Sequence, residues 1–282
     1  MDAVLQKNED YKIKKKIMST LNCIETYIDS NQNHYGCFII EPLETGQGIT
    51  LGNALRRTLL SDLTGLSITG VRINDLKHEF SIVEGLREDI LEVLLNLKEV
   101  VFNTSFTIKE EIATNLKNGR SLNIRGFLQV KGPVVVTAGM FKLPKKHFKV
   151  LNPNQYICTI VDDSELYMEI DIQSGKGYRL TDEIKKKGEE RKFSITKPST
   201  LLIDAIFMPV KQVNYKIKMI HDSKGNIKES LILEILTNGS ISPRRSLQES
   251  LKILMNLFYP LFVTENFVKL SSNLSPILLR KN

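Results

Sequence analysis

The sequence predicts an α+β fold with helices near both ends of the chain and a mostly β middle. Apolar residues recur at helical spacing over residues 50–63 and again after Ser242, whereas over 104–173 they recur with the period of two that is typical of strands. The chain has 282 residues, of which 41% are hydrophobic. This length and apolar content exclude a wholly disordered chain and suffice for one large or two ordinary domains.

The first half of the chain is predicted to alternate strands and helices. Residues 38–40 form a short strand, and a helix follows with Thr50 as its N-cap and Gly65 at its end. A second helix covers 88–98, where an apolar stripe follows acidic residues in the first turn. The strands predicted between these helices are 67–74 and 79–83.

From residue 104 onward the chain is predicted to consist mostly of strands, followed by one helix. The charged stretch from Thr181 to Lys197 is predicted to be a solvated loop. The last helix has Ser242 as its N-cap and Pro243 at its first position, and Pro260 disturbs or ends it. The predicted strands are 106–108, 122–130, 134–137, 156–161, 166–172, 203–220 with a bend at Pro209, and 231–236.

Charge and composition limit the class of protein. The formal net charge of +7 favours partners with phosphate groups or acidic surfaces. Apolar runs such as 134–136 stop far short of the roughly 20 residues of a membrane-spanning helix, so no membrane contact is predicted. Three sparse cysteines favour a reducing compartment over a disulfide scaffold. Residues 1–36 are predicted to be a basic, poorly ordered lead-in without the features of a secretion signal or an organelle transit peptide.

The sequence offers no convincing active site. Two Gly-x-Gly motifs, 46–48 and 175–177, lack the other positions of a phosphate-binding loop and are predicted to be turns. Glu169 and Asp171 share one face of a strand, as two-metal chemistry would need, but a solvent-facing surface is the preferred interpretation. A further group without the spacing of a common zinc site consists of Cys23, His34 and Cys37. We therefore predict no catalytic, cofactor-binding or metal-binding residue in this chain.

Two helices carry an apolar stripe that is wider than one sheet face requires. One interpretation is burial of both stripes against the protein's own sheet. The other is a seam shared between two copies of the chain, with a spacing close to a heptad seam in the second helix. Both can hold together, because Leu60 and Ile253 widen the apolar arc. The stripe residues are Leu51, Leu55, Leu59, Leu247, Leu251, Leu254 and Phe258.

The run from Phe38 to Ser61 closely resembles the signature of the α subunit of bacterial and plastid DNA-directed RNA polymerase, in its amino-terminal assembly region. Later segments resemble the same family in the same order, and the likeness covers roughly residues 37–265. These segments are 78–81, 84–85, 88–92, 95–98, 132–133, 136–138, 175–178, 203–205, 209–210, 213–215 and 237–241.

The resemblance implies a discontinuous α/β dimerisation domain made of residues 37–65 and 199–266, with a mostly-β domain of residues 66–198 inserted between them. It implies a homodimer in which the stripe residues of both helices meet their copies. In the family this dimer is the scaffold on which the β and β′ catalytic subunits assemble for DNA-templated transcription. The resemblance therefore implies a subunit of a nucleotidyltransferase complex, with Mg²⁺ in the large catalytic subunit and contact with DNA only through the complex.

The resemblance also implies four subunit-contact residues. Arg57 and Leu60 align with positions needed for contact with β, and Lys98 aligns with a position of β′ contact; Arg56 beside Arg57 completes the set. A guanidinium can bind a carboxylate with two parallel hydrogen bonds, and Leu60 can supply an apolar anchor beside it. Without the resemblance, Arg57 is expected to be a solvated helix residue and Lys98 a partner of the helix dipole.

The sequence departs from the family pattern at several places. Residues 267–282 are expected to form a tail, too short for the C-terminal DNA-binding domain of bacterial members. Arg179-Leu180 replaces the usual Val-Pro, and Met208 replaces a small hydroxyl residue. The Lys-, Ile- and Asn-rich composition suggests a plastid (chloroplast) stroma, with the bacterial cytoplasm as the alternative. The alternative function is a basic module that binds nucleic acid non-specifically.

Overall fold

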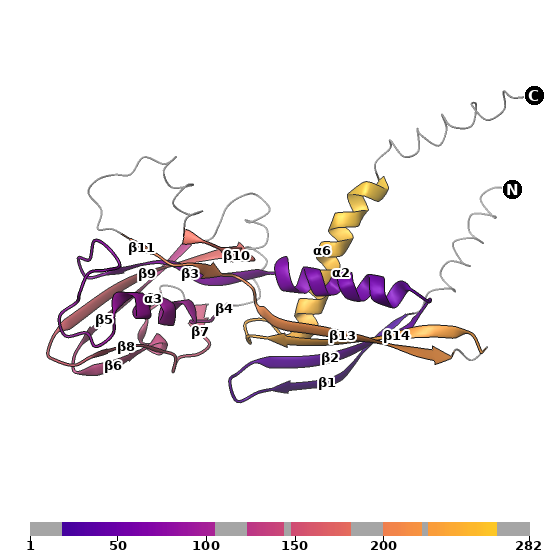
Figure 1. Ribbon diagram of the computed structural model, residues 1–282, viewed down its shortest axis with the longest axis horizontal. Coiled ribbons are helices and arrows are strands. Elements are labelled where there is room, and N and C mark those ends of the chain that lie inside the picture. Colours follow the sequence, from indigo (N-terminus) through magenta and orange to yellow (C-terminus); the bar gives the residue numbers. More distant parts are fainter. Residues whose placement is uncertain (1–18, 105–122, 144–147, 182–199, 222–224, 264–282) are drawn as a thin grey trace, which may run out of the picture.

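The computed structural model describes residues 19–104, 123–143, 148–181, 200–221 and 225–263. They form two lobes side by side: a β-rich lobe with one helix, and a lobe in which two long helices pack on a four-stranded sheet (Figure 1). The predicted fold class, α+β, is confirmed.

The lobe with two long helices combines the beginning and the end of the described chain, and we call it the two-segment lobe. Its elements are β1 (Thr20–Ile28), β2 (His34–Leu43), α2 (Gln47–Ser61), β13 (Val210–His221), β14 (Ile227–Thr237) and α6 (Pro243–Val263). The sheet has the order β1-β2-β14-β13 with all neighbours antiparallel, so β2 of the first segment pairs with β14 of the second. Because the sheet needs strands from both segments, neither segment can form this lobe by itself.

The core of the two-segment lobe lies between the sheet and its helices. Side chains alternate along the strands, so that Phe38 of β2 and Leu233 of β14 lie opposite each other, both buried on the helix side. Leu55 and Leu59 of α2 and Leu247 of α6 fill the other side of this cluster. Both helices therefore cover the same face of the sheet.

The other lobe, which we call the middle lobe, is built around a second antiparallel sheet. Its elements are β3 (Thr64–Ile73), α3 (Ile90–Lys98), β4 (Phe102–Thr104), β5 (Asn123–Lys131), β6 (Val134–Thr137), a 3₁₀ helix (Ala138–Met140), β7 (Phe148–Val150), β8 (Tyr156–Ile160), β9 (Glu165–Lys176), β10 (Tyr178–Arg179), β11 (Leu201–Leu202) and β12 (Ala205–Ile206). The sheet has the order β11-β3-β9-β5, and three two-stranded pairs, β4-β7, β6-β8 and β10-β12, accompany it. The apolar faces of the sheet and of α3 enclose a second, separate core.

Phe207 lies in the segment between β12 and β13, which connects the two lobes, and is 1% exposed. A Cβ on Gly65, near the start of β3, would lie 2.0 Å from the carbonyl oxygen of Phe207. A Cβ on Gly175 in β9 would lie 2.7 Å from its ring. Glycine at both positions is therefore what allows the connecting segment to pass this close to β3 and β9.

The prediction of a poorly ordered lead-in over residues 1–36 is wrong for residues 19–36. Strand β1 pairs with β2 from Thr20 to Ile28. All nine side chains of β1 are exposed, so the strand lacks the alternation of buried and exposed residues on which a sequence prediction depends. Residues 1–18 lie outside the described residues.

The helix ends also differ from the prediction. Helix α2 begins at Gln47 rather than after Thr50, because Gly46 takes a left-handed conformation with φ 89° and turns the chain one step earlier. Helix α6 contains Pro260 and continues to Val263. A proline removes one backbone donor, and the last turns of α6 are exposed, where water can satisfy the carbonyl left behind.

Most of the predicted strands are present, and two differ. The strand predicted at 79–83 is absent: residues 79–80 form a turn and 81–83 are irregular, with Phe80 and Ile82 exposed instead of packed on a sheet. The strand predicted at 203–220 is split into β12 and β13 around Phe207 and Pro209, since a proline cannot donate to a strand ladder. The predictions for 106–108 and 182–197 lie outside the described residues.

Glu88 ties the start of α3 to β8. Its buried carboxylate accepts hydrogen bonds from the Thr159 backbone N–H at 2.7 Å and from the Tyr156 hydroxyl, and it lies 3.0 Å from Nε of Arg87. Burial by itself raises the pKa of Glu88, but the hydrogen bonds from Tyr156, Thr159 and the backbone of Glu88, together with the Arg87 charge, outweigh it and hold the pKa below the ordinary value of 4.5. The ionised carboxylate is therefore part of the folded middle lobe.

We expect the middle lobe to lose stability in acid through Glu88. Because folding lowers the pKa of Glu88, its contribution to the free energy of unfolding is complete above about pH 4.5 and is lost as the pH falls through the folded-state pKa. Glu88→Gln should lower the free energy of unfolding by roughly 1–3 kcal/mol near neutral pH. It should also make the free energy of unfolding fall less steeply as the pH is lowered. Denaturant unfolding of the full chain at a series of pH values measures both effects.

Glu92→Gln is the matched control, because Glu92 is an exposed carboxylate on the same helix. Equal acid sensitivity of the wild type and Glu88→Gln would contradict this assignment.

Candidate functional site

The N-terminal end of α2 is held by a carboxylate from the other chain segment. Glu229 of β14 accepts hydrogen bonds from the backbone N–H groups of Gly46 and Gly48, each at 2.8 Å. These amides have no partner within the helix, and the positive end of the helix dipole favours a negative charge there. Close by, Nζ of Lys228 lies 2.5 Å from Oε2 of Glu44. Two contacts thus join the segments where α2 begins.

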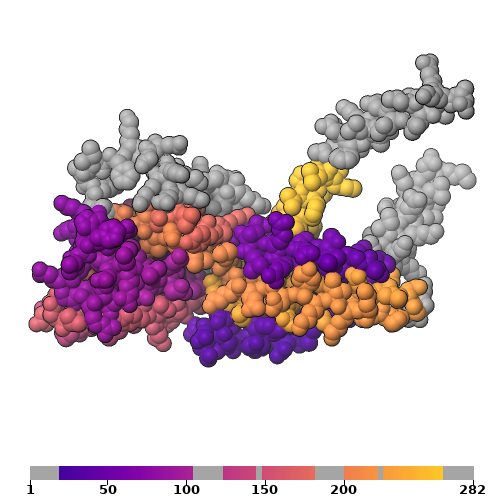
Figure 2. Space-filling model, in the orientation of Figure 1, coloured from indigo at the N-terminus to yellow at the C-terminus, as the bar shows by residue number. Residues whose placement is uncertain are grey.

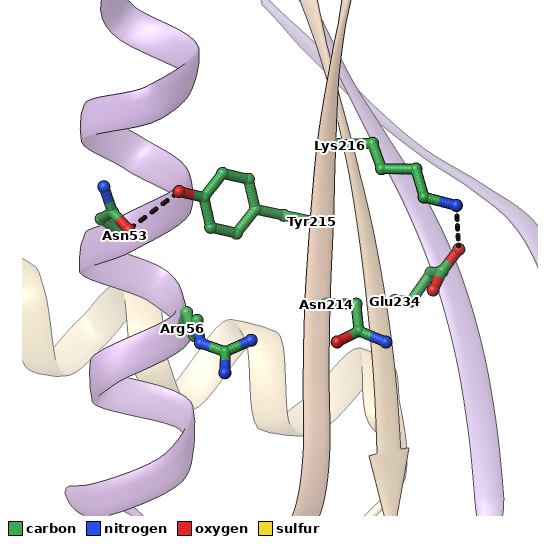
Figure 3. Close-up of a pocket in the computed structure, with 6 residues that line it drawn as sticks. All are labelled: Asn53, Arg56, Asn214, Tyr215, Lys216 and Glu234. Carbon is green, nitrogen blue, oxygen red and sulfur yellow. Dashed lines mark hydrogen bonds and ion pairs between the residues drawn. The ribbon is translucent and has the colours of Figure 1, made fainter.

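Two glycines let α2 lie close to the sheet. A Cβ on Gly48 would lie 2.8 Å from Oε2 of Glu229, and a Cβ on Gly52 would lie 2.7 Å from the ring of Tyr215 on β13. Tyr215 reaches the helix and donates its hydroxyl hydrogen bond to Oδ1 of Asn53 at 2.8 Å (Figure 3). The position of α2 along the sheet is therefore fixed near its start and near its middle.

Arg56 faces a groove of about 450 Å³ between α2 and the edge strand β13. Its guanidinium points toward β13 (Figure 3), and Nη1 donates a hydrogen bond to the carbonyl oxygen of Val213. On the far wall, Nζ of Lys216 lies 3.9 Å from Oε1 of Glu234. Arg56, predicted as a subunit contact, is thus occupied within its own chain.

Arg57 and Leu60 lie one turn apart on α2, on a part of its surface that faces solvent. Within the described part of the chain, the Arg57 side chain makes no hydrogen bond or ion pair, and it is exposed. Leu60 is half-buried and packs on the margin of the core. The two neighbouring arginines therefore differ: Arg56 is hydrogen-bonded within its own chain, whereas Arg57 is available to a partner beside an apolar side chain.

Three of the residues predicted at a dimer interface belong to the core of the chain's own two-segment lobe. Leu55, Leu59 and Leu247 are each 0% exposed. A side chain with no accessible surface cannot contact a second copy in this conformation. For these three residues the structure corrects the prediction: they pack against the sheet of the same chain.

The other residues of the predicted dimer interface remain at the surface. Leu51, Leu251 and Leu254 are half-buried at the margin of the core, and Phe258 is 60% exposed. Beyond them α6 extends away from the sheet and rises above the molecular surface (Figure 2). We call this part of the helix the apolar end of α6. Its exposed apolar side chains are Met255, Leu257, Phe258, Tyr259, Leu261 and Phe262. Among the described residues no helix, α6 included, has the length and apolar character needed to cross a membrane.

Lys98 lies in the middle lobe, in a polar cluster at the end of α3. Its Nζ is 3.5 Å from the Tyr178 hydroxyl oxygen and 4.0 Å from Oδ2 of Asp204. Asp204 also accepts hydrogen bonds from the backbone N–H of Thr181 and the hydroxyl of Tyr178, both at 2.9 Å, and these bonds hold its pKa below the ordinary range. The predicted contact residues therefore lie at two separate places, α2 and the end of α3.

Glu169 and Asp171 are engaged by arginines on both neighbouring strands. Arg72 lies 2.5 Å from Glu169 and 3.2 Å from Asp171, and Arg125 lies 3.4 Å and 3.2 Å from the same two carboxylates. Two guanidinium groups offset the two negative charges, as in a structural ion-pair network. Across the described ranges no group of three His, Cys, Asp or Glu residues could hold a metal ion.

Sequence reasoning missed the residues that position these sites: Glu229, Tyr215 and Asp204. Glu229 is separated from Gly48 by 181 positions, and Tyr215 from Asn53 by 162. Helix-capping rules consider only the few residues around a helix start, so they cannot find such a partner. No local signal singles out Glu229, because β14 also carries a second carboxylate, Glu234.

We expect Glu229→Gln to weaken the attachment of α2. Replacing the carboxylate loses one of two charge-assisted hydrogen bonds and the interaction with the helix dipole, so the free energy of unfolding should fall by about 1–3 kcal/mol. Hydrogen exchange should accelerate at the backbone amides of Gly46 and Gly48. Glu234→Gln, on the same strand, is the control, because Glu234 only pairs loosely with Lys216. Unchanged exchange at α2 in Glu229→Gln would contradict the proposed cap.

Comparison with known proteins gives one consistent result. The RNA polymerase Rpb3/RpoA insert domain family matches residues 71–208. DNA-directed RNA polymerase subunit alpha from Rhodomonas salina is 46% identical over 241 residues, which are 86% of this chain and 69% of that relative. The subunit of the same name from Mesostigma viride is 46% identical over 244 residues, 86% of this chain and 70% of the relative. That from Trichormus variabilis is 42% identical over 241 residues, with the same two shares of 86% and 70%.

Proposed function

This chain belongs to the family of α subunits of DNA-directed RNA polymerase, and on that basis we propose that it is a homodimeric scaffold on which the β and β′ subunits assemble. Family membership makes it a subunit of the nucleotidyltransferase complex that carries out DNA-templated transcription. We assign the phosphodiester chemistry and its Mg²⁺ to the large catalytic subunit. The pairing of Glu169 and Asp171 with arginines supports that assignment.

The exposure of the apolar end of α6 is the observation that most directly supports the proposal of a homodimer. Its side chains are among the most exposed apolar ones in the described chain, up to 85% for Phe262. A contiguous apolar surface of this kind on a soluble protein marks a site of association. It continues into Leu251, Leu254 and Leu51 at the margin of the core. A second copy would offer the same surface, so that two α6 helices can bury each other across a twofold axis.

The two separate contact sites support two different large partners. We propose that Arg57 and Leu60 of one copy contact β, since a free guanidinium beside an apolar side chain suits a carboxylate next to an apolar pocket. Lys98 of the other copy would contact β′ from the polar cluster with Tyr178 and Asp204. A dimer has two copies of each site. In the proposed complex β would occupy the Arg57 site of one copy, and β′ would occupy the Lys98 site of the other.

We further propose that residues 37–65 and 199–266 form the dimerisation domain and residues 66–198 the inserted domain. Two separate apolar cores support two domains, although Leu201 and Ile203 of the second segment pack in the core of the middle lobe. The first boundary falls inside β3, which begins at Thr64, and the second falls outside the described residues.

For the cellular location we propose the plastid stroma, with the bacterial cytoplasm as the alternative. The composition supports a plastid gene, and the similarity to subunits from both Rhodomonas salina and Trichormus variabilis is compatible with either place. Immunoblotting of purified plastids beside the remaining cell fractions distinguishes the two.

Charged residues on the apolar end of α6 should produce monomers. Phe258→Asp combined with Phe262→Asp opposes burial at a dimer interface, because a buried unpaired carboxylate is costly. Both side chains are exposed in the single chain, so the fold should be retained, as circular dichroism can show. Sedimentation equilibrium should give the mass of one chain instead of two. Ile227→Asp is the control, because Ile227 is similarly exposed (57%) on β14; a double variant that stays dimeric would overturn this interface.

Arg57→Ala and Lys98→Ala should impair different partners. Loss of an interface arginine typically costs about 2 kcal/mol or more, so Arg57→Ala should weaken binding to β by more than tenfold. Lys98→Ala should weaken binding to β′ and leave binding to β unchanged. Affinity measurements of the full chain with each purified large subunit separate the two effects.

Lys216→Ala is the control for both variants, because Lys216 is exposed and takes part only in a loose surface ion pair. If each substitution weakened both partners equally, the assignment of two sites would be wrong.

A further inference from the structure

The four-stranded sheet of the two-segment lobe ends in two edge strands, β13 and β1, which are built differently. Edge strands of soluble proteins are commonly protected from pairing with other chains by lysines, by bulges or by a covering element. Strand β13 carries exposed lysines at Lys211, Lys216 and Lys218, and Arg56 of α2 covers its carbonyl group at Val213. This edge is protected.

Strand β1 lacks most of this protection. It runs for nine residues, has no Lys, Arg or Pro, and contains one charged side chain, Glu25. Its composition of Thr, Ile, Leu and Tyr suits a strand with a neighbour on each side. One bulge, between Cys23 and Glu25, interrupts its register with β2. In Figure 1 β1 forms the margin of the sheet opposite to α2, so it is separate from the apolar end of α6 and from Arg57.

The apolar face of the sheet continues onto β1, where no element among the described residues covers it. Leu21 lies opposite Ile40, which is buried in the core, yet Leu21 is 44% exposed and Ile28 at the end of the strand is 64% exposed. On the opposite face Tyr27 stacks on Tyr35 with ring centres 4.7 Å apart. A further strand beside β1 would cover Leu21 and Ile28 on one face and the edge of Tyr27 on the other.

The charge around β1 indicates what kind of segment fits. Residues 19–55 contain four acidic residues and no Lys or Arg, in a chain whose net charge is +7. Glu44 pairs with Lys228, and Asp29 accepts hydrogen bonds within its own hairpin turn. Within the described residues, Glu25 and Glu41 form no ion pair. Among the described residues, Glu25 and Glu41 near the open edge therefore lack counter-charges, which favours a basic partner.

We propose that the open edge of β1 binds an extended segment of a partner protein as an added strand, in which apolar residues alternate with polar ones that include Lys or Arg. Backbone hydrogen bonds to the edge supply the affinity, and the apolar positions pack on Leu21 and Ile28. The basic positions lie near Glu25. Pairing with β1 of a second copy is disfavoured, since it would bring the Glu25 side chains of both copies together.

A synthetic peptide that alternates valine with threonine and lysine tests this proposal on the full-length dimer. Hydrogen exchange should slow at the backbone amides of residues 20–28 that face away from β2 when the peptide is added. The same peptide with glutamate in place of lysine should bind at least about tenfold more weakly, as expected for a favourable charge contact. A peptide that is N-methylated at every second amide, on the edge that faces β1, should not bind, because it cannot form the strand ladder.

Thr26→Lys on β1 should weaken binding of the peptide, and Gln212→Lys on the protected edge β13 is the matched control. The N-methylated peptide keeps the test independent of whether Thr26→Lys folds. The proposal is overturned if the β1 amides that face away from β2 exchange slowly before the peptide is added, or if their protection depends on protein concentration instead of peptide. It is equally overturned if the peptide protects another surface, or if the N-methylated peptide binds as well as the parent. Sedimentation separates this result from the dimer proposal, because loss of peptide binding should leave the dimer intact.

Discussion

The carboxylate of Glu229 at the start of α2 is the interaction on which the two-segment lobe depends. Glu229 lies on β14, whereas the amides that it binds, at Gly46 and Gly48, come from about 180 positions earlier in the chain. The hydroxyl of Tyr215 on Asn53 adds a second attachment between the same two segments. Both contacts attach α2 to the sheet, so the helix is held in one orientation. The side chains that α2 exposes to solvent are therefore fixed as well.

That position determines what the molecule presents to other chains. It turns Leu55 and Leu59 into the core and leaves Arg57 on the surface beside Leu60. Helix α6 packs on the same core with its first half and carries its apolar second half beyond the sheet (Figure 1). The same core therefore supports two neighbouring surfaces with different chemistry, one apolar and suited to a copy of itself, the other basic and suited to another protein. Lys98, held in the middle lobe, adds a third surface that does not depend on α2.

The α+β class and the two apolar helices could be predicted because hydrophobic periodicity is a local property. The width of a helical stripe shows that side chains are buried but not against what, so it leaves both partners of Leu55 open; the resemblance implies a second copy, whereas Leu55 packs on its own sheet. The difference between Arg56 and Arg57 could not be predicted, because it depends on the carbonyl group of Val213, 157 positions away. Strand β1 escaped prediction for another reason: its pairing rests on the backbone, and its exposed side chains carry no burial pattern.

The most direct measurement of the central claim is site-specific cross-linking in the assembled polymerase. A photo-cross-linking residue placed at Phe262 reports what covers the apolar end of α6, and one placed at Arg57 reports what lies on α2. We expect the residue at Phe262 to cross-link to a second copy of this chain, which gives a product with twice the mass of one chain. We expect the residue at Arg57 to cross-link to a large subunit. A cross-link from Phe262 only to a large subunit, or none to a second copy, would contradict it.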